Sequence, residues 1–171
     1  THAGPSNLQQ GIDNKIYGVV GYSGFDGEIL NKEHKFSQGV YRFNTDLSDF
    51  EHIAKTSNNT WGLGINEDNA IFASTANNTH SVFVGIPSTY FTDVKGLPEK
   101  GSAKIDGHYD IKPITQKIRQ VDVFGGFTAA SGHHFYTAKS YPESFWNKVA
   151  FVTEPTGNLV HMAVIETDGA G

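Results

Sequence analysis

Histidine and asparagine are the residue types in this chain that could support chemistry. The adjacent pair His133-His134 stands out among eight histidines. Because neighbours in a strand point to opposite faces, only one of the two can face a site. The spacing of His80, His108 and His161 does not favour a centre in which several histidines hold one metal ion. We therefore predict no metal site and at most one working imidazole from the pair.

Four asparagines flank expected strands and carry amide groups that can bond sugar hydroxyls or the carbonyls of a cofactor. They are Asn7, Asn59, Asn77 and Asn78. The alternative is that each of them caps a turn, as asparagine commonly does. Trp61 also has two uses, because an indole can stack on a ligand ring or pack between sheets. These five residues and His133 form the predicted binding set.

The acidic residues do not form a pattern typical of a calcium loop. Asp46, Asp49 and Glu51 fall in what the sequence predicts as a turn between strands. Glycosidase or lyase chemistry would need carboxylates that converge on a bound sugar, and the sequence does not show which acids converge. A polysaccharide lyase or hydrolase is therefore a second alternative for the function.

Short strands separated by turns must position these side chains. Nineteen glycines, twelve phenylalanines and seven tyrosines favour aromatic strands broken by frequent turns over long helices. The expected strands are 15–21, 39–43, 50–55, 69–74, 81–86, 133–138, 149–153 and 158–165. Residues 142–146 are expected to form one short helical turn. The sequence therefore predicts an all-β fold.

A weak internal repeat indicates how these strands are grouped. Residues 11–18 return as 64–73, with Ile16 and Ile71 in matching places, and a fainter third copy includes Phe135. Repeats of this length, each with about four strands, are typical of radial β-architectures.

We therefore predict one domain that is a partial β-propeller of about three blades, each a four-stranded antiparallel sheet. The predicted blades are 1–56, 57–120 and 121–171, and the looser pattern over 89–118 predicts one long inter-strand excursion. In such a propeller the side chains of the four asparagines would point toward one opening of the central channel.

Composition excludes several classes of function. A net charge of −5 argues against a nucleic-acid surface, because such surfaces need clustered lysine and arginine. The absence of cysteine excludes a disulfide, a catalytic thiol and a haem attachment motif within these residues. No apolar run approaches the roughly 20 residues of a transmembrane segment. Because the chain opens on Thr1 and ends on a turn-like stretch, we expect a segment of a longer secreted or periplasmic protein.

Three sets of residues resemble known propellers. The stretch from His2 through Asn7 to Asn14 resembles the signature of the glucose/sorbosone dehydrogenase propellers, with Asn14 in place of a turn glycine. Residues 58–65 are similar to the next blade entry of that family, with Asn58 where an arginine is expected, and 131–136 look like a later blade. The phrases 58–62 and 154–160 are most similar to membrane-bound-dehydrogenase-type propeller domains, which are often joined to a c-type haem module.

The resemblance implies a quinoprotein-like sugar or alcohol dehydrogenase. His2 would then take the proton from a sugar hydroxyl as hydride leaves for a quinone, a role that suits an imidazole titrating near pH 6.5. The implied cofactor is pyrroloquinoline quinone with calcium, and the implied partners are a sugar or other small-molecule substrate and a c-type haem domain. The quinone is a tricarboxylate that favours guanidinium or ammonium groups, and the chain has only two arginines. The main alternative is a non-catalytic propeller that binds carbohydrate or a protein partner through the same mouth.

Overall fold

Antiparallel sheets make up the described part of the molecule. The computed structural model describes residues 3–77, 79–97, 101–105, 107, 109–118 and 124–169. Within these ranges thirteen strands form four sheets, and helical structure is limited to the 3-10 turns η1 (Ser88–Tyr90), η2 (Glu143–Phe145) and η3 (Pro155–Gly157). The predicted all-β fold is confirmed. No helix in the described ranges is long and apolar enough to cross a membrane.

Sheet 1 has four strands in the order β1-β2-β5-β6, and a separate hairpin, β3-β4, is inserted between its second and third strands. Its strands are β1 (Pro5–Gln10), β2 (Lys15–Val20), β5 (Gly39–Asn44) and β6 (Phe50–Lys55). The hairpin consists of β3 (Phe25–Ile29) and β4 (Lys32–Phe36).

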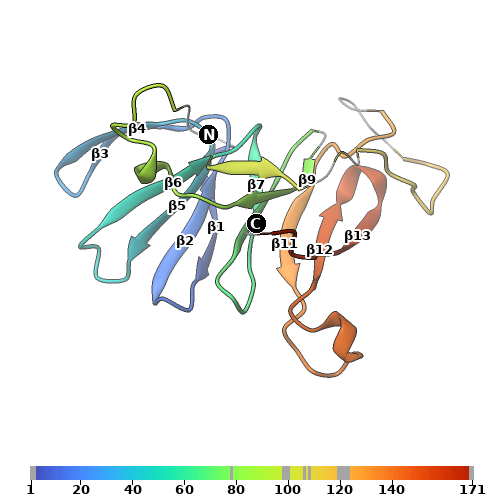
Figure 1. The fold of residues 1–171 in the computed structure, drawn as a ribbon. Helices are drawn as coiled ribbons and strands as arrows, with labels where there is room; N and C mark the ends of the chain where they lie inside the picture. Colours follow the sequence, from blue (N-terminus) through green and yellow to red (C-terminus); the bar gives the residue numbers. More distant parts are fainter. Residues whose placement is uncertain are drawn as a thin grey trace.

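Sheets 2 and 3 are simple meanders, in which each strand pairs with the next one along the chain. Sheet 2 contains β7 (Thr60–Ile65), β8 (Ile71–Thr75), β9 (Thr79–Val84) and β10 (Ser102–Lys104). Sheet 3 contains β11 (Ser131–Phe135), β12 (Val149–Glu154) and β13 (Leu159–Val164). The hairpin and the three sheets follow one another across the molecule (Figure 1).

The core lies between sheets that pack face to face. Alternation along β2 and β8 sends Tyr17 and Ala73 into the layer between sheets 1 and 2, where they are buried. Phe72 points to the other face of sheet 2 and packs with Phe135 and Ala150 of sheet 3. Both faces of sheet 2 are therefore covered, and each fully buried large side chain contributes roughly 1.5–3 kcal/mol through burial.

The structure corrects the predicted repeat in one place. Ile16 and Ile71 do lie in matching strands, the second strands of sheets 1 and 2. Phe135, however, ends β11, the first strand of sheet 3, so the third copy was assigned to the wrong strand. The cause is the long loop 136–148, which separates β11 from β12 and shifts the pattern along the sequence.

The predicted excursion over 89–118 also contains a strand that the sequence did not reveal. The short strand β10 pairs antiparallel with β9, and Ala103 lies opposite Phe83. Three residues in a polar stretch are too few to show the alternation that predicts a strand. They form a strand because they pair with β9.

Candidate functional site

The first strand of each of the three sheets carries a β-bulge. The pairing of β1 with β2, of β7 with β8 and of β11 with β12 slips by one residue, which leaves one extra residue in the first strand each time. The slips fall at Asn7 or Leu8 in β1, at Trp61 in β7 and at His133 in β11. A bulge re-aims the side chain it carries, so three residues of the predicted binding set occupy equivalent special positions.

Side-chain amides of β1 bond the edge of β7 that has no neighbouring strand in its sheet. The Asn7 amide donates to the carbonyl of Trp61, and the Gln9 amide donates to the carbonyl of Leu63 at 2.6 Å. Both strands are edges of their sheets, so these carbonyls would otherwise lack a partner. Asn7 has a left-handed backbone (φ +54°) and an exposed side chain, a conformation that asparagine tolerates well. The role of Gln9 was missed, although it lies two residues after Asn7 and so shares a face with it in a regular strand.

Two glycines let β7 and β11 touch backbone to backbone. A Cβ at Gly62 would lie 1.8 Å from the carbonyl oxygen of Gly132, and one at Gly64 would lie 2.0 Å from that of His133. No side chain fits at either position. Alternate glycines within a strand are the sequence signal of such a close approach.

Asn59 lies in the crossover from sheet 1 to sheet 2 and is 9% exposed. Its Oδ1 accepts a hydrogen bond from the Tyr22 amide at 2.9 Å, and its carbonyl accepts one from the Ala76 amide at 2.7 Å. The residue therefore joins the turns that follow β2 and β8. Its side-chain oxygen already serves the fold, which favours the turn-binding alternative for Asn59.

Thr128 holds the crossover into sheet 3 in the same manner. Its carbonyl accepts from the Asn77 amide at 3.1 Å, and its own amide donates to Glu154 Oε2 at 3.0 Å. Glu154 is fully buried and also accepts from the amides of Ala129 and Thr156. These bonds compensate the buried carboxylate, so it serves the fold and is closed to a ligand.

His133 lies in a buried cluster between sheets 2 and 3. Its Nε2 is 2.5 Å from Ser81 Oγ, which also lies 2.9 Å from His80 Nδ1. Burial, followed by the charges of His80 and His161, lowers the pKa of His133 to about 3. Ser81 and His133 are 2% and 1% exposed, so this serine–histidine pair is closed to a substrate. His134 is exposed, as the opposite-face argument predicts.

Three polar atoms around the β8–β9 turn are buried without a hydrogen-bond partner among the described residues. They are Thr75 Oγ1, Asn77 Oδ1 and Thr79 Oγ1. Thr75 and Thr79 are 0% and 3% exposed, so these oxygens are closed to a ligand, and each unmade bond costs about 1–3 kcal/mol of stability.

Asn7, Asn59, Trp61 and Asn77 are brought to one region, which we call the bulge site. Asn7 bonds the backbone of Trp61, and Asn59 bonds the residue that precedes Asn77. Trp61 and Asn77 are half-buried. His133 lies on the far side of β7 in the closed cluster described above. His2 and Asn78 lie outside the described residues.

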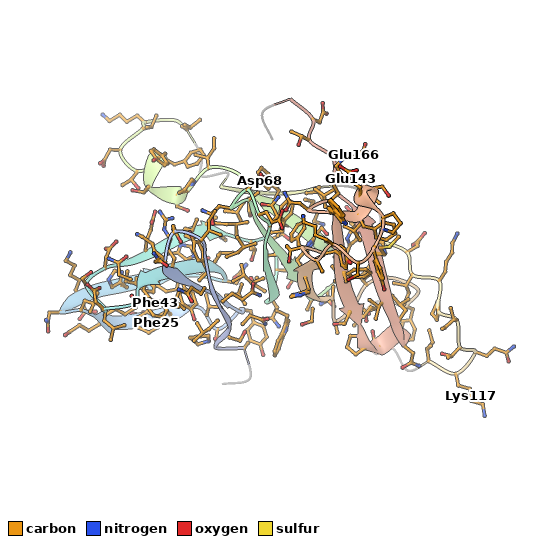
Figure 2. The ribbon with its side chains drawn as sticks, turned by 90° about the horizontal axis from the view of Figure 1, so that it is seen from below. Phe25, Phe43, Asp68, Lys117, Glu143 and Glu166 are labelled. Carbon is orange, nitrogen blue, oxygen red and sulfur yellow. The ribbon has the colours of Figure 1, made fainter. Side chains whose placement is uncertain are left out.

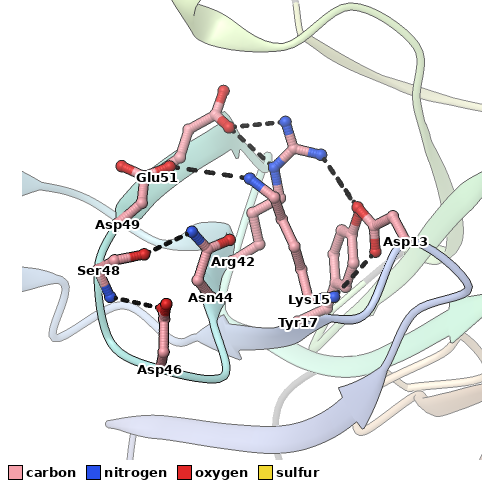
Figure 3. Close-up of polar contacts among 9 residues, drawn as sticks. All are labelled: Asp13, Lys15, Tyr17, Arg42, Asn44, Asp46, Ser48, Asp49 and Glu51. Atoms are coloured by element: carbon pink, nitrogen blue, oxygen red, sulfur yellow. Dashed lines mark hydrogen bonds and ion pairs between the residues drawn. The ribbon is translucent and has the colours of Figure 1, made fainter.

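The bulge site does not fit pyrroloquinoline quinone. Its side chains are amides and an indole with threonine hydroxyls nearby, and a tricarboxylate needs cationic partners. Arg42 lies toward the other end of sheet 1, where it bonds Glu51 at 2.8 Å and Tyr17 at 3.2 Å (Figure 3). Burial disfavours its charge, but these two partners outweigh burial and raise the pKa of Arg42. The other arginine, Arg119, lies outside the described residues.

Calcium, the implied companion of the quinone, has no ligand set here either. Glu154 already accepts bonds from three residues, and in the described ranges no group of three or more histidine, aspartate or glutamate side chains is arranged to hold a metal ion.

An aromatic cavity of about 300 Å³ lies on the face of sheet 1 that points away from sheet 2. Tyr41, Phe43 and Phe50 contribute from the sheet, and Phe25 contributes from the β3-β4 hairpin. Figure 2 shows Phe25 and Phe43 close together at this end of the molecule. The cavity is almost wholly apolar, so it suits apolar side chains and does not suit a sugar.

Comparison with known proteins gives a family and no named relative. The model of the family described as "Domain of unknown function (DUF7133)" matches residues 1–171, so the chain belongs to this family. No curated protein and no solved structure matches the chain.

Proposed function

We propose that this member of the DUF7133 family is an arc of a β-propeller that binds a neutral carbohydrate at the bulge site without catalysing a reaction. The observation that carries the proposal is the pairing of a half-buried indole, Trp61, with an exposed carboxamide, Asn7, at equivalent bulges of adjacent strands. Indoles stack on sugar rings. The Asn7 Nδ2 donates to the Trp61 carbonyl, and the exposed amide keeps its Oδ1 as an acceptor for a sugar hydroxyl.

The packing of the sheets supports the propeller part of the proposal. In a propeller each sheet packs on a neighbour through each of its two faces. Sheet 2 does so, with one face on sheet 1 and the other on sheet 3. The aromatic cavity of sheet 1 and the exposed Val160, Met162 and Val164 of sheet 3 are then the faces that further sheets of the ring would cover.

The one histidine of the predicted binding set is not available as a base, which favours binding over catalysis. His133 has a pKa of about 3 and is buried, so it would not accept a proton from a sugar at neutral pH. The dehydrogenase prediction depends on His2 and stays a prediction. The c-type haem partner and the periplasmic or extracellular location stay predictions with it.

The two tryptophans allow a direct test, because each can be removed to isolate the other. Trp146 lies in the 136–148 loop, where its indole donates to the carbonyl of Tyr141. The Trp146→Phe variant leaves Trp61 as the only indole, and we expect its emission to change saturably with a neutral sugar from a panel of mono- and oligosaccharides. Trp61→Phe should weaken binding measured by calorimetry about tenfold, a typical effect of losing one aromatic contact.

Two outcomes would contradict the proposal. If the emission of the Trp146→Phe variant stays constant with every sugar of the panel, the bulge site does not bind sugar. Reduction of a dye with sugar after addition of quinone and calcium would contradict the non-catalytic function and favour the dehydrogenase.

A further inference from the structure

We infer that a groove between β6 and β10 is a binding site for a small oxyanion, a phosphate or sulfate group. The groove has a volume of about 210 Å³ and lies between the outer strands of sheets 1 and 2. One wall is formed by Lys55, Thr56 and Ser57, and the other by Gly101, Ser102 and Lys104, with Val82 between them. The groove shares the crossover from sheet 1 to sheet 2 with the bulge site but is lined by none of the bulge-site residues, so the inference does not depend on the proposed function.

The lysine charges of the groove have no acidic partner among the described residues. Neither Lys55 nor Lys104 forms an ion pair there, and no described aspartate or glutamate lines the cavity. The Lys104 ammonium lies 4.9 Å from the centroid of the Tyr109 ring, a contact that does not neutralise its charge. Three other lysines, Lys15, Lys35 and Lys139, each have a carboxylate within 4 Å. Two ammonium groups that line one cavity raise the local concentration of anions, in a chain whose net charge is −5.

Hydroxyl groups complete the donor set and fix the walls. The Ser102 hydroxyl donates to the carbonyl of Lys55, which ties β10 to the end of β6. The hydroxyls of Thr56 and Thr60 lie 2.6 Å apart and hold the start of the crossover. Ser57 is exposed beside the two lysines and can donate to an oxyanion. A lysine ammonium acts on a phosphate as a point charge, which does not need the planar fit of an arginine.

The size of the groove limits the ligand. A volume of about 210 Å³ is roughly seven times the share of one water molecule in the liquid, about 30 Å³. One tetrahedral oxyanion with a few waters fits this space. The oxyanion can be a free ion or a group carried on a larger molecule that extends into solvent.

Titration of the 171-residue chain with inorganic phosphate and with sulfate, at constant ionic strength, tests the inference. We expect saturable changes in the amide resonances of residues 55–57 and 101–104, beyond those produced by chloride. The double variant Lys55→Gln with Lys104→Gln should bind about tenfold more weakly, because both charges are lost. The matched control is Lys35→Gln, which removes an exposed lysine that pairs with Asp26 and should leave the affinity unchanged.

A second arm compares dextran with dextran sulfate to identify the source of the anion. Tighter binding of dextran sulfate than of free sulfate supports a sulfate ester on a polymer, and equal binding per sulfate group supports the free ion. Wild-type affinity in the double variant, or equal shifts with chloride, would overturn the inference. The double variant should keep the response of Trp61 to neutral sugars, so failure of this inference and failure of the proposed function are distinguishable.

Discussion

His133 lies at a bulge of β11 with its ring stacked on Phe72, at 5.5 Å between ring centroids. Its Nε2 contacts the Ser81 hydroxyl, and its Nδ1 has no partner among the described residues. A buried imidazole with a lone, unpaired nitrogen is stable only when neutral. The residue therefore packs the interface between sheets 2 and 3 in one protonation state.

This environment makes the stability of the molecule depend on pH. The pKa of His133 is about 3 in the folded chain and near 6.5 in an unfolded one. Between these two pH values the folded state therefore binds fewer protons than the unfolded state. The contribution of the neutral imidazole is complete above pH 6.5 and is lost as the pH falls toward 3. We expect the free energy of unfolding to fall by about 2 kcal/mol between pH 6.5 and pH 4.5, measured by urea denaturation.

Two variants show whether His133 is the source of that dependence. His133→Phe keeps an aromatic ring beside Phe72 and Phe135 but cannot titrate, so the slope of stability against pH should become shallower. His134→Gln removes the exposed neighbour and should leave the slope as it is. A wild-type slope in His133→Phe would mean that another group is responsible.

Among the elements, the first strands of the three sheets are held together in two ways. Side-chain amides of β1 bond β7, and glycines of β7 let β11 approach it closely. At Gly64 a Cβ would lie 2.4 Å from the Cβ of His133, in addition to its clash with the carbonyl of that residue. The neighbour is backbone and cannot rotate away. The joint between β7 and β11 therefore requires glycine for reasons of space.

Gly64→Ala should destabilise the molecule by about 3 kcal/mol, because β7 and β11 must separate to make room for one methyl group. Thermal and urea denaturation measure this loss. Gly107→Ala is the matched control, because no atom of the described residues lies within 4 Å of a Cβ built there. If both variants had the stability of the wild type, the close contact between the two strands would be wrong.

At the scale of the whole molecule, the two outer faces remain open. Val160, Met162 and Val164 are 61%, 48% and 57% exposed along β13, and the aromatic cavity opens on the outer face of sheet 1. Leu30 and Leu47 line that cavity from left-handed backbone positions (φ +55° and +58°), which a leucine rarely adopts. Exposed apolar surface of this kind is typical of sites that pack against another surface.

The open faces predict that the 171-residue chain binds an apolar fluorescent dye. Replacing Met162 and Val164 together by lysine should remove roughly half of the dye signal, because one of the two faces becomes charged. His134→Lys adds a charge to sheet 3 without removing an exposed apolar side chain, and should keep the signal. An unchanged signal in the double variant would show that the β13 face is not an open apolar surface.

Local sequence pattern is enough to predict the fold class and the positions of most central strands. Runs such as 50–55 and 149–153 carry enough apolar and aromatic residues to predict a strand from local pattern alone, and both are strands. The strands β1 and β7 are not predicted by local pattern. The first is largely polar and the second contains two glycines, so neither has a strong strand pattern.

The roles of the predicted site residues depend on how the sheets pack against one another. Local pattern placed Asn59 and His133 next to strands but did not show that the first joins two turns and that the second is sealed between two sheets. Those roles depend on residues that are distant in the sequence, such as Tyr22 and Ser81. Hydrogen bonds and burial between distant segments arise when the sheets pack, and a single sequence carries no local record of them.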